Sequence, residues 1–335
     1  MKPFLEKSLD QLNAHFPAQW SPHFPRKVYL DLTQDCNMFC IMCRDSIQRE
    51  GKSMDFSLFQ RVVKQTRDGA GSYSLFNWGE PLLLEDFRQR VVYVNAVKRP
   101  ETKLDISTNG MLLDLETIAF LVENDVQVTV SFDAADKETF ESIRRGSHFE
   151  TVCENLRALC NYSTSFERWR VPGIYVSMQK MNWKQVGRIV RLAHQLGVQR
   201  IGFGPVVGPV EYRYPRTPEA LSELERALQL SEELGMYIDL FPTCLGDKVL
   251  VGNHFVSHEN FVVDRSCDAP LHSVSVAWNG DVFLCCNVGA KVGNLNETSF
   301  QELWNGSAYD RLRKQVNDAH DAPSFCRECA WVNRF

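Results

Sequence analysis

The chain has 335 residues, which is enough for about two domains of ordinary size or for one large α/β barrel with an appendage. Hydrophobic residues make up 44% of it and charged residues 24%, and this composition excludes a disordered chain. With 37 basic and 42 acidic residues the net charge is −5, which argues against a general nucleic-acid binder with its concentrated basic surface. The 11 cysteines are an odd number, so they cannot all pair in internal disulfides.

The start of the chain lacks the pattern of a secretory signal, because no apolar stretch follows Lys2. No apolar run in the sequence approaches the roughly 18 residues that a membrane-spanning helix needs. We therefore expect a cytoplasmic protein. In that compartment, clustered cysteines bind metal or take part in catalysis more often than they form disulfides.

Residues 1–27 are rich in proline and are predicted to form an irregular N-terminal arm. From residue 28 to residue 242, short apolar runs typical of strands alternate with helical patterns. The predicted strands are 28–33, 72–77, 104–108, 126–132, 174–178, 200–203 and 236–240, and the predicted helices are 57–66, 85–97, 115–123, 149–160, 183–196 and 218–234. This alternation predicts an α/β fold, a partial (β/α)6 TIM-like barrel with its site at the C-terminal ends of the strands.

The pattern changes after residue 242, and residues 243–335 are predicted to form a second, smaller domain. This domain begins with a loop-rich stretch. Asn279-Gly280 then lies between apolar segments at 273–278 and 281–284, which predicts a β-hairpin with a two-residue turn. A helix over residues 299–316 is predicted to follow the hairpin.

Three cysteines, Cys36, Cys40 and Cys43, directly follow the first predicted strand. At this spacing, one loop can direct three thiolates at a single metal centre. A 4Fe–4S cluster held by three thiolates leaves one iron that can bind a substrate or a cofactor. The alternatives are three buried apolar cysteines or a zinc site that lacks its fourth ligand.

The Cys-x3-Cys-x2-Cys spacing resembles that of the radical S-adenosylmethionine (SAM) superfamily, and further segments lie in the matching order. The sequence Asn-Trp-Gly-Glu-Pro at residues 77–81 resembles the Gly-Gly-Glu-Pro motif of the family, with Trp78 in place of its first glycine. Ser-Thr-Asn-Gly at residues 107–110 resembles the Thr-Asn-Gly element. Ser131 lies at the end of the fourth predicted strand, before Phe132, and a pair of arginines at 144–145 is expected in the helix that follows this strand, for which no bounds are predicted.

The resemblance implies that the three cysteines hold a 4Fe–4S cluster whose open iron binds SAM. One electron from the reduced cluster then cleaves SAM, and the 5′-deoxyadenosyl radical removes a hydrogen atom from an unactivated C–H bond. Arg145 is the alternative to Arg144 for the SAM carboxylate. The further SAM contacts that the resemblance implies are Gly79, Glu80, Thr108, Asn109, Ser131 and Arg144.

Four later cysteines, Cys267, Cys285, Cys326 and Cys329, can supply all the protein ligands of a second 4Fe–4S cluster or of a zinc ribbon. The Cys-x12-Gly-x4-Cys part resembles the SPASM extension of radical SAM enzymes, and the layout up to Cys329 resembles its shorter "twitch" form. The resemblance thus implies one auxiliary cluster, and two 4Fe–4S clusters in all. Cys286 is the alternative ligand to Cys285, although the spacing favours Cys285.

The remaining cysteines include two candidate catalytic residues, Cys286 and Cys244. If Cys286 points into the cavity, its thiol can donate a hydrogen atom to a substrate radical. Cys153 and Cys160 lie seven residues apart on one helical face and are interpreted as small buried hydrophobic residues.

Two reactions stay open: oxidation, with the auxiliary cluster as electron acceptor, and epimerisation, with hydrogen returned from a thiol. Only 35 residues precede Cys36, so the N-terminal peptide-recognition domain of many SPASM relatives is not expected. This favours a small polar substrate of the carbohydrate or aminocyclitol type. The alternatives are a peptide-modifying enzyme with a separate recognition protein, and a non-catalytic metal-binding scaffold, against which Glu80 and Asn109 argue. The expected partners are the substrate and an electron donor such as flavodoxin or ferredoxin, with neither nucleic acid nor a membrane.

Overall fold

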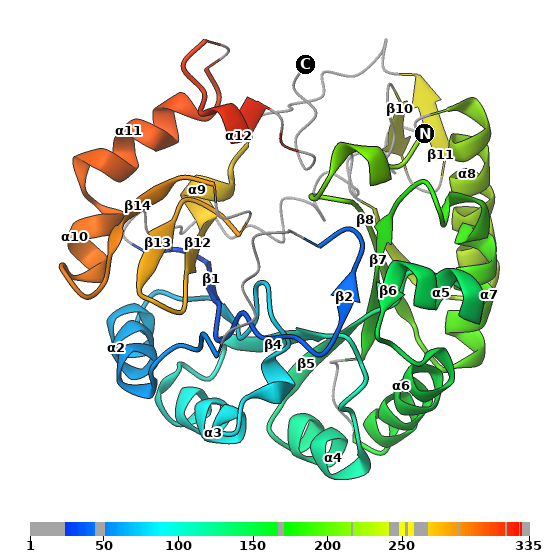
Figure 1. Ribbon diagram of the computed structural model, residues 1–335, viewed down its shortest axis with the longest axis horizontal. Helices are drawn as coiled ribbons and strands as arrows, with labels where there is room; N and C mark the ends of the chain where they lie inside the picture. The colour runs from blue at the N-terminus through cyan, green and yellow to red at the C-terminus, as the bar shows by residue number, and fades with distance from the viewer. Residues whose placement is uncertain are drawn as a thin grey trace, which may run out of the picture.

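The computed structural model describes residues 24–43, 51–166, 171–215, 217–240, 248–251, 254–257, 267–286, 289–318, 320–327 and 329. Its main feature is a ten-stranded sheet in the order β14-β13-β12-β1-β3-β4-β5-β7-β8-β9. From β12 to β9 every neighbouring pair is parallel. The sheet curves into a partial barrel with helices around its outer face (Figure 1). The predicted partial α/β barrel is therefore confirmed.

The strands of the barrel are β1 (Lys27–Leu30), β3 (Ser72–Ser74), β4 (Lys103–Thr108), β5 (Val126–Ser131), β7 (Gly173–Met178), β8 (Arg200–Pro205) and β9 (Tyr237–Leu240). The outer helices are α2 (Phe56–Thr66), α3 (Phe87–Val97), α4 (Leu115–Glu123), α5 (Lys137–Ile143), α6 (Phe149–Thr164), α7 (Val186–Gln195) and α8 (Pro218–Glu233). Several helices begin where a side chain accepts a hydrogen bond from their first turn, as Asp55, Asp114 and Asp136 do for α2, α4 and α5. The caps of α2 and α4 lie next to the predicted starts of these helices, whereas α5 is not among the helices with predicted bounds.

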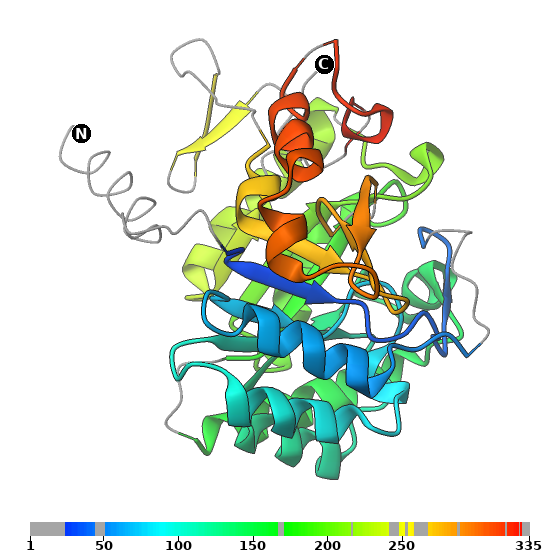
Figure 2. The ribbon, with the colours of Figure 1, turned by 90° about the vertical axis from the view of Figure 1, so that its left-hand side faces the viewer.

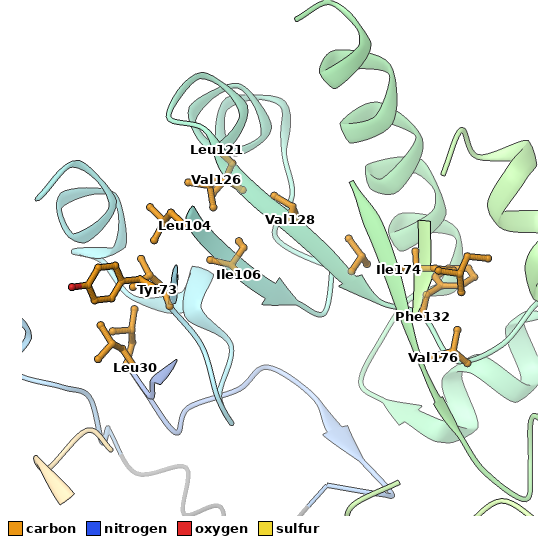
Figure 3. Close-up of a cluster of buried hydrophobic side chains, with 14 of the residues drawn as sticks. Leu30, Tyr73, Leu104, Ile106, Leu121, Val126, Val128, Phe132, Ile174 and Val176 are labelled. Carbon is orange, nitrogen blue, oxygen red and sulfur yellow. The ribbon is translucent and has the colours of Figure 1, made fainter. Parts of the chain in front are cut away.

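The hydrophobic core lies between the sheet and the outer helices. In β4 and β5, alternate residues are buried against the helices, among them Leu104, Ile106 and Val128 (Figure 3). The residues between them, such as Asp105 and Thr129, are polar and half-buried, and they line the inside of the barrel. A closed TIM barrel fills its interior with bulky branched side chains, whereas this barrel keeps an interior space that polar and aromatic side chains line together.

The C-terminal hairpin extends the sheet of the barrel. Strand β12 (Ser273–Val276) pairs in parallel with β1, and β13 (Asp281–Phe283) and β14 (Lys291–Asn294) follow antiparallel. The predicted turn is present, with Gly280 at φ +87°, a backbone conformation that favours glycine. The short helices α9 (Ala269–His272) and α12 (Ser324–Arg327) lie on the same side of the molecule as this hairpin (Figure 2).

Three local expectations need correction. The helix predicted over residues 299–316 is two helices, α10 (Phe300–Trp304) and α11 (Ser307–Gln315), because Gly306 between them is extended at ψ 156°. A Cβ at Gly306 would lie 2.6 Å from the carbonyl oxygen of Glu302, so other residues fit this break poorly. The loop-rich stretch after residue 242 contains an antiparallel hairpin, β10 (Lys248–Val251) and β11 (His254–Ser257).

The third correction concerns the arginine pair, which was expected inside a helix. Helix α5 ends at Ile143, and β6 (Arg144–Arg145) pairs antiparallel with β2 (Phe39–Cys40). The pairing draws Arg144 out of the helix and places it opposite Cys40 in the cysteine loop. In the part of the chain that the structure describes, no helix is both long enough and apolar enough to cross a membrane.

Candidate active site

A cavity of about 580 Å³ occupies the inside of the barrel. One part of it lies at the C-terminal ends of the strands, and the other part reaches the residues with which the strands begin. The sequence-predicted residues that line it are Cys36, Cys40, Cys43, Gly79, Glu80, Thr108, Asn109, Ser131, Arg144 and Cys286. All the residues expected to hold the first cluster and to contact SAM are thus brought together around one space.

The cysteine loop follows β1 and faces this cavity. Cys36 lies 4.0 Å (Sγ) from Nδ2 of Asn109, and Cys40 lies 3.9 Å (Sγ) from Nη1 of Arg144. Burial raises the pKa of the Cys40 thiol to about 11, and the Arg144 charge partly opposes this rise. Three thiols that face a cavity, two of them beside N–H donors, fit the donor set of an iron–sulfur cluster with one open iron.

Glu80 is buried at the loop after β3 and joins two of the loops around the cavity. Its carboxylate accepts hydrogen bonds from the backbone N–H of Asn109 (2.7 Å), from Oγ1 of Thr108 (2.8 Å) and from the backbone N–H of Leu82 (3.2 Å). Burial raises the pKa of Glu80 to about 7, although these donors and Arg144 lower it. The carboxyl group therefore titrates near neutral pH in the unliganded protein.

Two residues hold the motif loops against the cysteine loop. Nδ2 of Asn109 donates to Oδ1 of Asn37 at 2.6 Å. Gly79 packs so closely on the segment that follows β1 that a Cβ at this position would lie 2.2 Å from the carbonyl oxygen of Thr33. Only glycine permits this approach, which explains its place before Glu80.

The two adjacent arginines, Arg144 and Arg145, lie in different environments. Arg144 is buried and lines the cavity, whereas Arg145 is exposed. Nη2 of Arg144 lies 2.7 Å from Oδ2 of Asp133, which directly follows β5, two residues after Ser131. Sequence reasoning assigned no role to Asp133. The signal was present, because a carboxylate directly after a barrel strand lies at the functional end of the barrel.

Cys286 lines the same cavity, and the hydroxyl of Tyr29 donates a hydrogen bond to its sulfur. Burial raises the pKa of the Cys286 thiol, and the nearby Lys27 opposes this rise. Burial also raises the pKa of Tyr29. Sequence reasoning missed Tyr29. The second catalytic candidate, Cys244, lies outside the described residues.

The four C-terminal cysteines come from three segments of the hairpin region. Cys267 precedes α9, Cys285 follows β13, Cys326 belongs to α12, and Cys329 lies just beyond it. Asn317, after α11, holds Cys267 in place: its Oδ1 accepts from the Cys267 backbone N–H at 2.7 Å, and its Nδ2 donates to the Cys267 carbonyl at 3.1 Å. Across the described ranges, no three Cys, His, Asp or Glu side chains form a group that could hold one metal ion. The four thiols are nevertheless the donor set that a fully ligated cluster requires.

Comparison with known proteins bears out the family resemblance. The family model of the radical SAM superfamily matches residues 30–193, and the model of the SPASM iron–sulfur cluster-binding domain matches residues 267–330. The first match spans the cysteine loop and the motif loops around the cavity. The second spans all four C-terminal cysteines.

Three related proteins illustrate the range of the similarity. A tungsten-containing aldehyde ferredoxin oxidoreductase cofactor-modifying protein from Pyrococcus furiosus is 24% identical over 328 residues, which cover 90% of this chain and 86% of that protein. Mycofactocin maturase MftC from Mycolicibacterium smegmatis is 25% identical over 302 residues, which cover 86% of this chain and 72% of that protein. An uncharacterized protein from Archaeoglobus fulgidus is 26% identical over 167 residues, or 49% of this chain, which spans only 38% of that protein's length.

Two solved structures share the fold at low sequence identity. Streptococcus suis SuiB bound to precursor peptide SuiA has a TM-score of 0.67 and 16% identity, covering 92% of this chain and 70% of SuiB. BtrN in complex with AdoMet and 2-DOIA has a TM-score of 0.51 and 17% identity, covering 91% of this chain and 93% of BtrN. The family matches identify the cofactors as SAM, the radical SAM 4Fe–4S cluster and auxiliary iron–sulfur chemistry. This protein belongs to the radical SAM superfamily, carries a C-terminal SPASM iron–sulfur domain and is a radical SAM enzyme.

Proposed function

We propose that this enzyme cleaves SAM reductively and removes a hydrogen atom from a C–H bond of a small polar substrate bound in the barrel. The observation that carries the proposal is the single cavity that holds the cysteine loop at the strand ends and polar side chains deeper inside. When bound, the cluster and SAM supply the 5′-deoxyadenosyl radical that removes the hydrogen atom. The chain itself positions the substrate and keeps water away from the radical.

We assign Cys36, Cys40 and Cys43 to the SAM-binding cluster. Backbone groups of Gly79 and the carboxylate of Glu80 would hold the methionyl ammonium of SAM.

We assign Thr108 and Asn109 to the ribose side of SAM, and Ser131 with Arg144 to its carboxylate. The choice of Arg144 over Arg145 is supported by burial, since Arg144 lines the cavity and Arg145 is exposed. Asp133 acts as a positioning residue, because its ion pair holds the Arg144 guanidinium beside Cys40.

A small polar substrate is supported by the inner surface of the barrel. Short polar side chains from three strands line it, including Ser107, Thr129 and Ser177, beside aromatic residues such as Phe76 and Tyr175. Hydroxyl groups of this kind donate and accept hydrogen bonds, which suits a substrate rich in hydroxyls, as carbohydrates and cyclitols are.

The position of Cys286 favours hydrogen return over oxidation. In this step the S–H bond of Cys286 breaks and a C–H bond forms at the substrate radical, which leaves a thiyl radical. One electron from a flavodoxin- or ferredoxin-type donor and one proton restore the thiol. In D2O, the wild type should incorporate one deuterium at the reacting carbon, and Cys286→Ala should not. Unchanged product in Cys286→Ala would remove this role.

We further assign Cys267, Cys285, Cys326 and Cys329 to one auxiliary 4Fe–4S cluster. A peptide substrate is the second candidate, because SuiB was solved with a precursor peptide and a mycofactocin maturase is among the relatives. Reaction of a precursor peptide in the presence of a separate recognition protein would favour that candidate over a small molecule.

Anaerobic reconstitution tests the proposal. The wild type with iron, sulfide, dithionite and SAM should release 5′-deoxyadenosine and hold about eight irons per chain, as two 4Fe–4S clusters require. The variant C36A/C40A/C43A should release none and hold about four irons. Absence of 5′-deoxyadenosine from the fully loaded wild type would refute the enzyme assignment, and about four irons with one zinc would favour a zinc ribbon.

A further inference from the structure

We propose that the end of the cavity away from the cysteine loop binds an oxyanion of the substrate, a carboxylate or a phosphate group. This inference rests on the proposed function, because that function makes the occupant of the cavity the substrate. Three basic side chains line this end: Lys27, Lys103 and Arg200. The substrate is therefore an acidic small molecule, such as a sugar acid or a sugar phosphate, and not a cationic aminocyclitol.

The three basic residues lie at the same end of the barrel because each one begins a strand. Lys27 is the first residue of β1, Lys103 the first of β4 and Arg200 the first of β8. The motif residues that we assign to SAM follow the opposite ends of the strands. Lys27 pairs with Ser72 and Ser72 with Lys103, so the two lysines are two strand spacings apart, about 10 Å between backbones. Their long side chains can reach one anion between them.

The charge balance at this end favours an anion. Asp105 is the one acidic residue among the described residues that line it, and its carboxylate is already engaged. Oδ1 of Asp105 accepts from Oγ of Ser74 at 2.8 Å and lies 3.8 Å from Nζ of Lys27. Among the described residues that line this end, three basic side chains outnumber the one carboxylate. Charge lining a cleft of low dielectric attracts the opposite charge strongly.

Arg200 has hydrogen-bonding capacity that the described part of the chain leaves unused. Its Nη2 donates to Oγ1 of Thr129 at 3.2 Å, while its Nε is buried without a partner among the described residues. The guanidinium packs on Gly173, where a Cβ would lie 3.0 Å from Nε and from Nη2. A buried N–H without a partner is costly, and a guanidinium pairs well with carboxylate or phosphate oxygens. A substrate oxyanion would satisfy this group.

Inorganic phosphate is the probe for the site, and the anaerobic full-length protein is the sample. Phosphate should raise the melting temperature of the wild type above that in sodium chloride of equal ionic strength, because a ligand that binds only the folded state stabilises it. In calorimetric titration, the dissociation constant of phosphate should be at least ~10-fold higher for K103Q/R200Q than for the wild type. The control K64Q/R157Q removes the same charge from exposed positions on α2 and α6 and should bind phosphate as the wild type does.

A second variant keeps all three cations and is expected to raise the affinity for phosphate. Asp105→Asn removes the one carboxylate and should bind phosphate a few-fold tighter than the wild type. If circular dichroism shows that K103Q/R200Q is unfolded, Asp105→Asn and the charge-preserving K103R/R200K decide the test. Phosphate affinity unchanged in Asp105→Asn, or equal in wild type and K103Q/R200Q, would overturn the inference.

The remaining arms identify the ligand chemistry. Acetate, gluconate and glucose 6-phosphate should compete with phosphate, and the better competitor distinguishes a carboxylate from a phosphate. Glucose and 2-deoxystreptamine should not compete, and tight binding of 2-deoxystreptamine without phosphate binding would overturn the inference. Release of 5′-deoxyadenosine by the wild type without added phosphate tests the proposed function independently. SAM cleavage without phosphate binding would refute the anion site and leave the proposed function standing. Phosphate binding without SAM cleavage would refute the proposed function.

Discussion

Asp133 and Arg144 form a buried ion pair, with 2.7 Å between Oδ2 and Nη2 and side chains that are 0% and 8% exposed. The pair joins the end of β5 to β6, and Nη1 of the same guanidinium lies 3.9 Å from Sγ of Cys40. Oδ1 of Asp133 also accepts from the backbone N–H of Ser177 at 2.7 Å. The barrel therefore holds the Arg144 guanidinium on one side, and the other side of the guanidinium faces the cysteine loop.

Asp133→Asn should destabilise the protein and weaken SAM binding together. The substitution leaves the Arg144 charge buried without its counter-ion, which costs about 3 kcal/mol. Urea unfolding under anaerobic conditions measures the stability, and equilibrium dialysis measures SAM affinity, which should fall at least ~10-fold if Arg144 holds the SAM carboxylate. Glu116→Gln, which breaks the exposed pair with Arg88, should change stability by less than about 1 kcal/mol. Unchanged SAM affinity in a destabilised Asp133→Asn protein would show that the pair is only structural.

SAM binding should weaken as the pH falls below about 7, because of Glu80. Burial raises the pKa of Glu80 to about 7 in the unliganded protein, whereas the ammonium of SAM requires the carboxylate form. Below that pH the carboxylate must first lose a proton, so the dissociation constant should rise by up to ~10-fold per pH unit. Equilibrium dialysis from pH 5.5 to 8.5 measures this slope, which Glu80→Gln should abolish. A slope that persists in Glu80→Gln would assign it to another group.

The stability of the SAM-free protein should show the opposite trend with pH. A raised folded pKa means that the native state binds a proton that the unfolded chain has already lost, between pH 4.5 and about 7. Stability should therefore decrease as the pH rises through this window and level off above it. Asp31, whose pKa burial also raises to about 7, adds a similar trend. The free energy of unfolding is measured against pH for the wild type and for Glu80→Gln, and the difference between the two curves gives the contribution of Glu80. Parallel curves would contradict this contribution.

Two glycine-to-alanine substitutions should change stability in opposite directions. A Cβ on Gly79 would lie 2.2 Å from the Thr33 carbonyl oxygen and 2.7 Å from that of Asp35, so Gly79→Ala must displace the loop. It should destabilise the protein by more than about 1 kcal/mol and lower SAM affinity. Gly187 in α7 has open space around its Cβ position, and Gly187→Ala should stabilise by about 0.5–1 kcal/mol. Both effects can be read from thermal unfolding, and equal effects at the two sites would refute the close-packing argument.

Most of the barrel could be predicted from the sequence because its signals are local. The apolar alternation in residues 103–108 and the Asp cap of α4 mark elements without knowledge of their neighbours. The short helix α5 is not among the helices with predicted bounds, although Asp136 caps it. The spacing of Cys36, Cys40 and Cys43 is likewise local, since one loop carries all three.

Features that depend on contacts across the chain could not be predicted in the same way. Arg144 continues a helical pattern, and only pairing with Cys40, about a hundred residues earlier, makes it part of a strand. The role of Asp133 could not be predicted either, because it depends on the same placement of Arg144. The strand-first residues Lys27, Lys103 and Arg200 are visible in the sequence as polar residues, but only the curvature of the sheet brings them to one cavity.

The iron content of variants should distinguish the roles of the adjacent residues Cys285 and Cys286. Cys286 lines the barrel cavity beside Tyr29 and also lies close to Cys329, whereas Cys285 lies after β13 near the buried Tyr309. A thiol that faces the substrate cavity is free for hydrogen transfer only if its neighbour holds the cluster. Cys285→Ala should therefore lose about four irons per chain, while Cys286→Ala and the control Cys153→Ala on α6 keep the wild-type content. Iron analysis with Mössbauer spectroscopy measures this without turnover. If Cys286→Ala loses the iron and Cys285→Ala retains it, then Cys286 is the ligand and its place as hydrogen donor is lost.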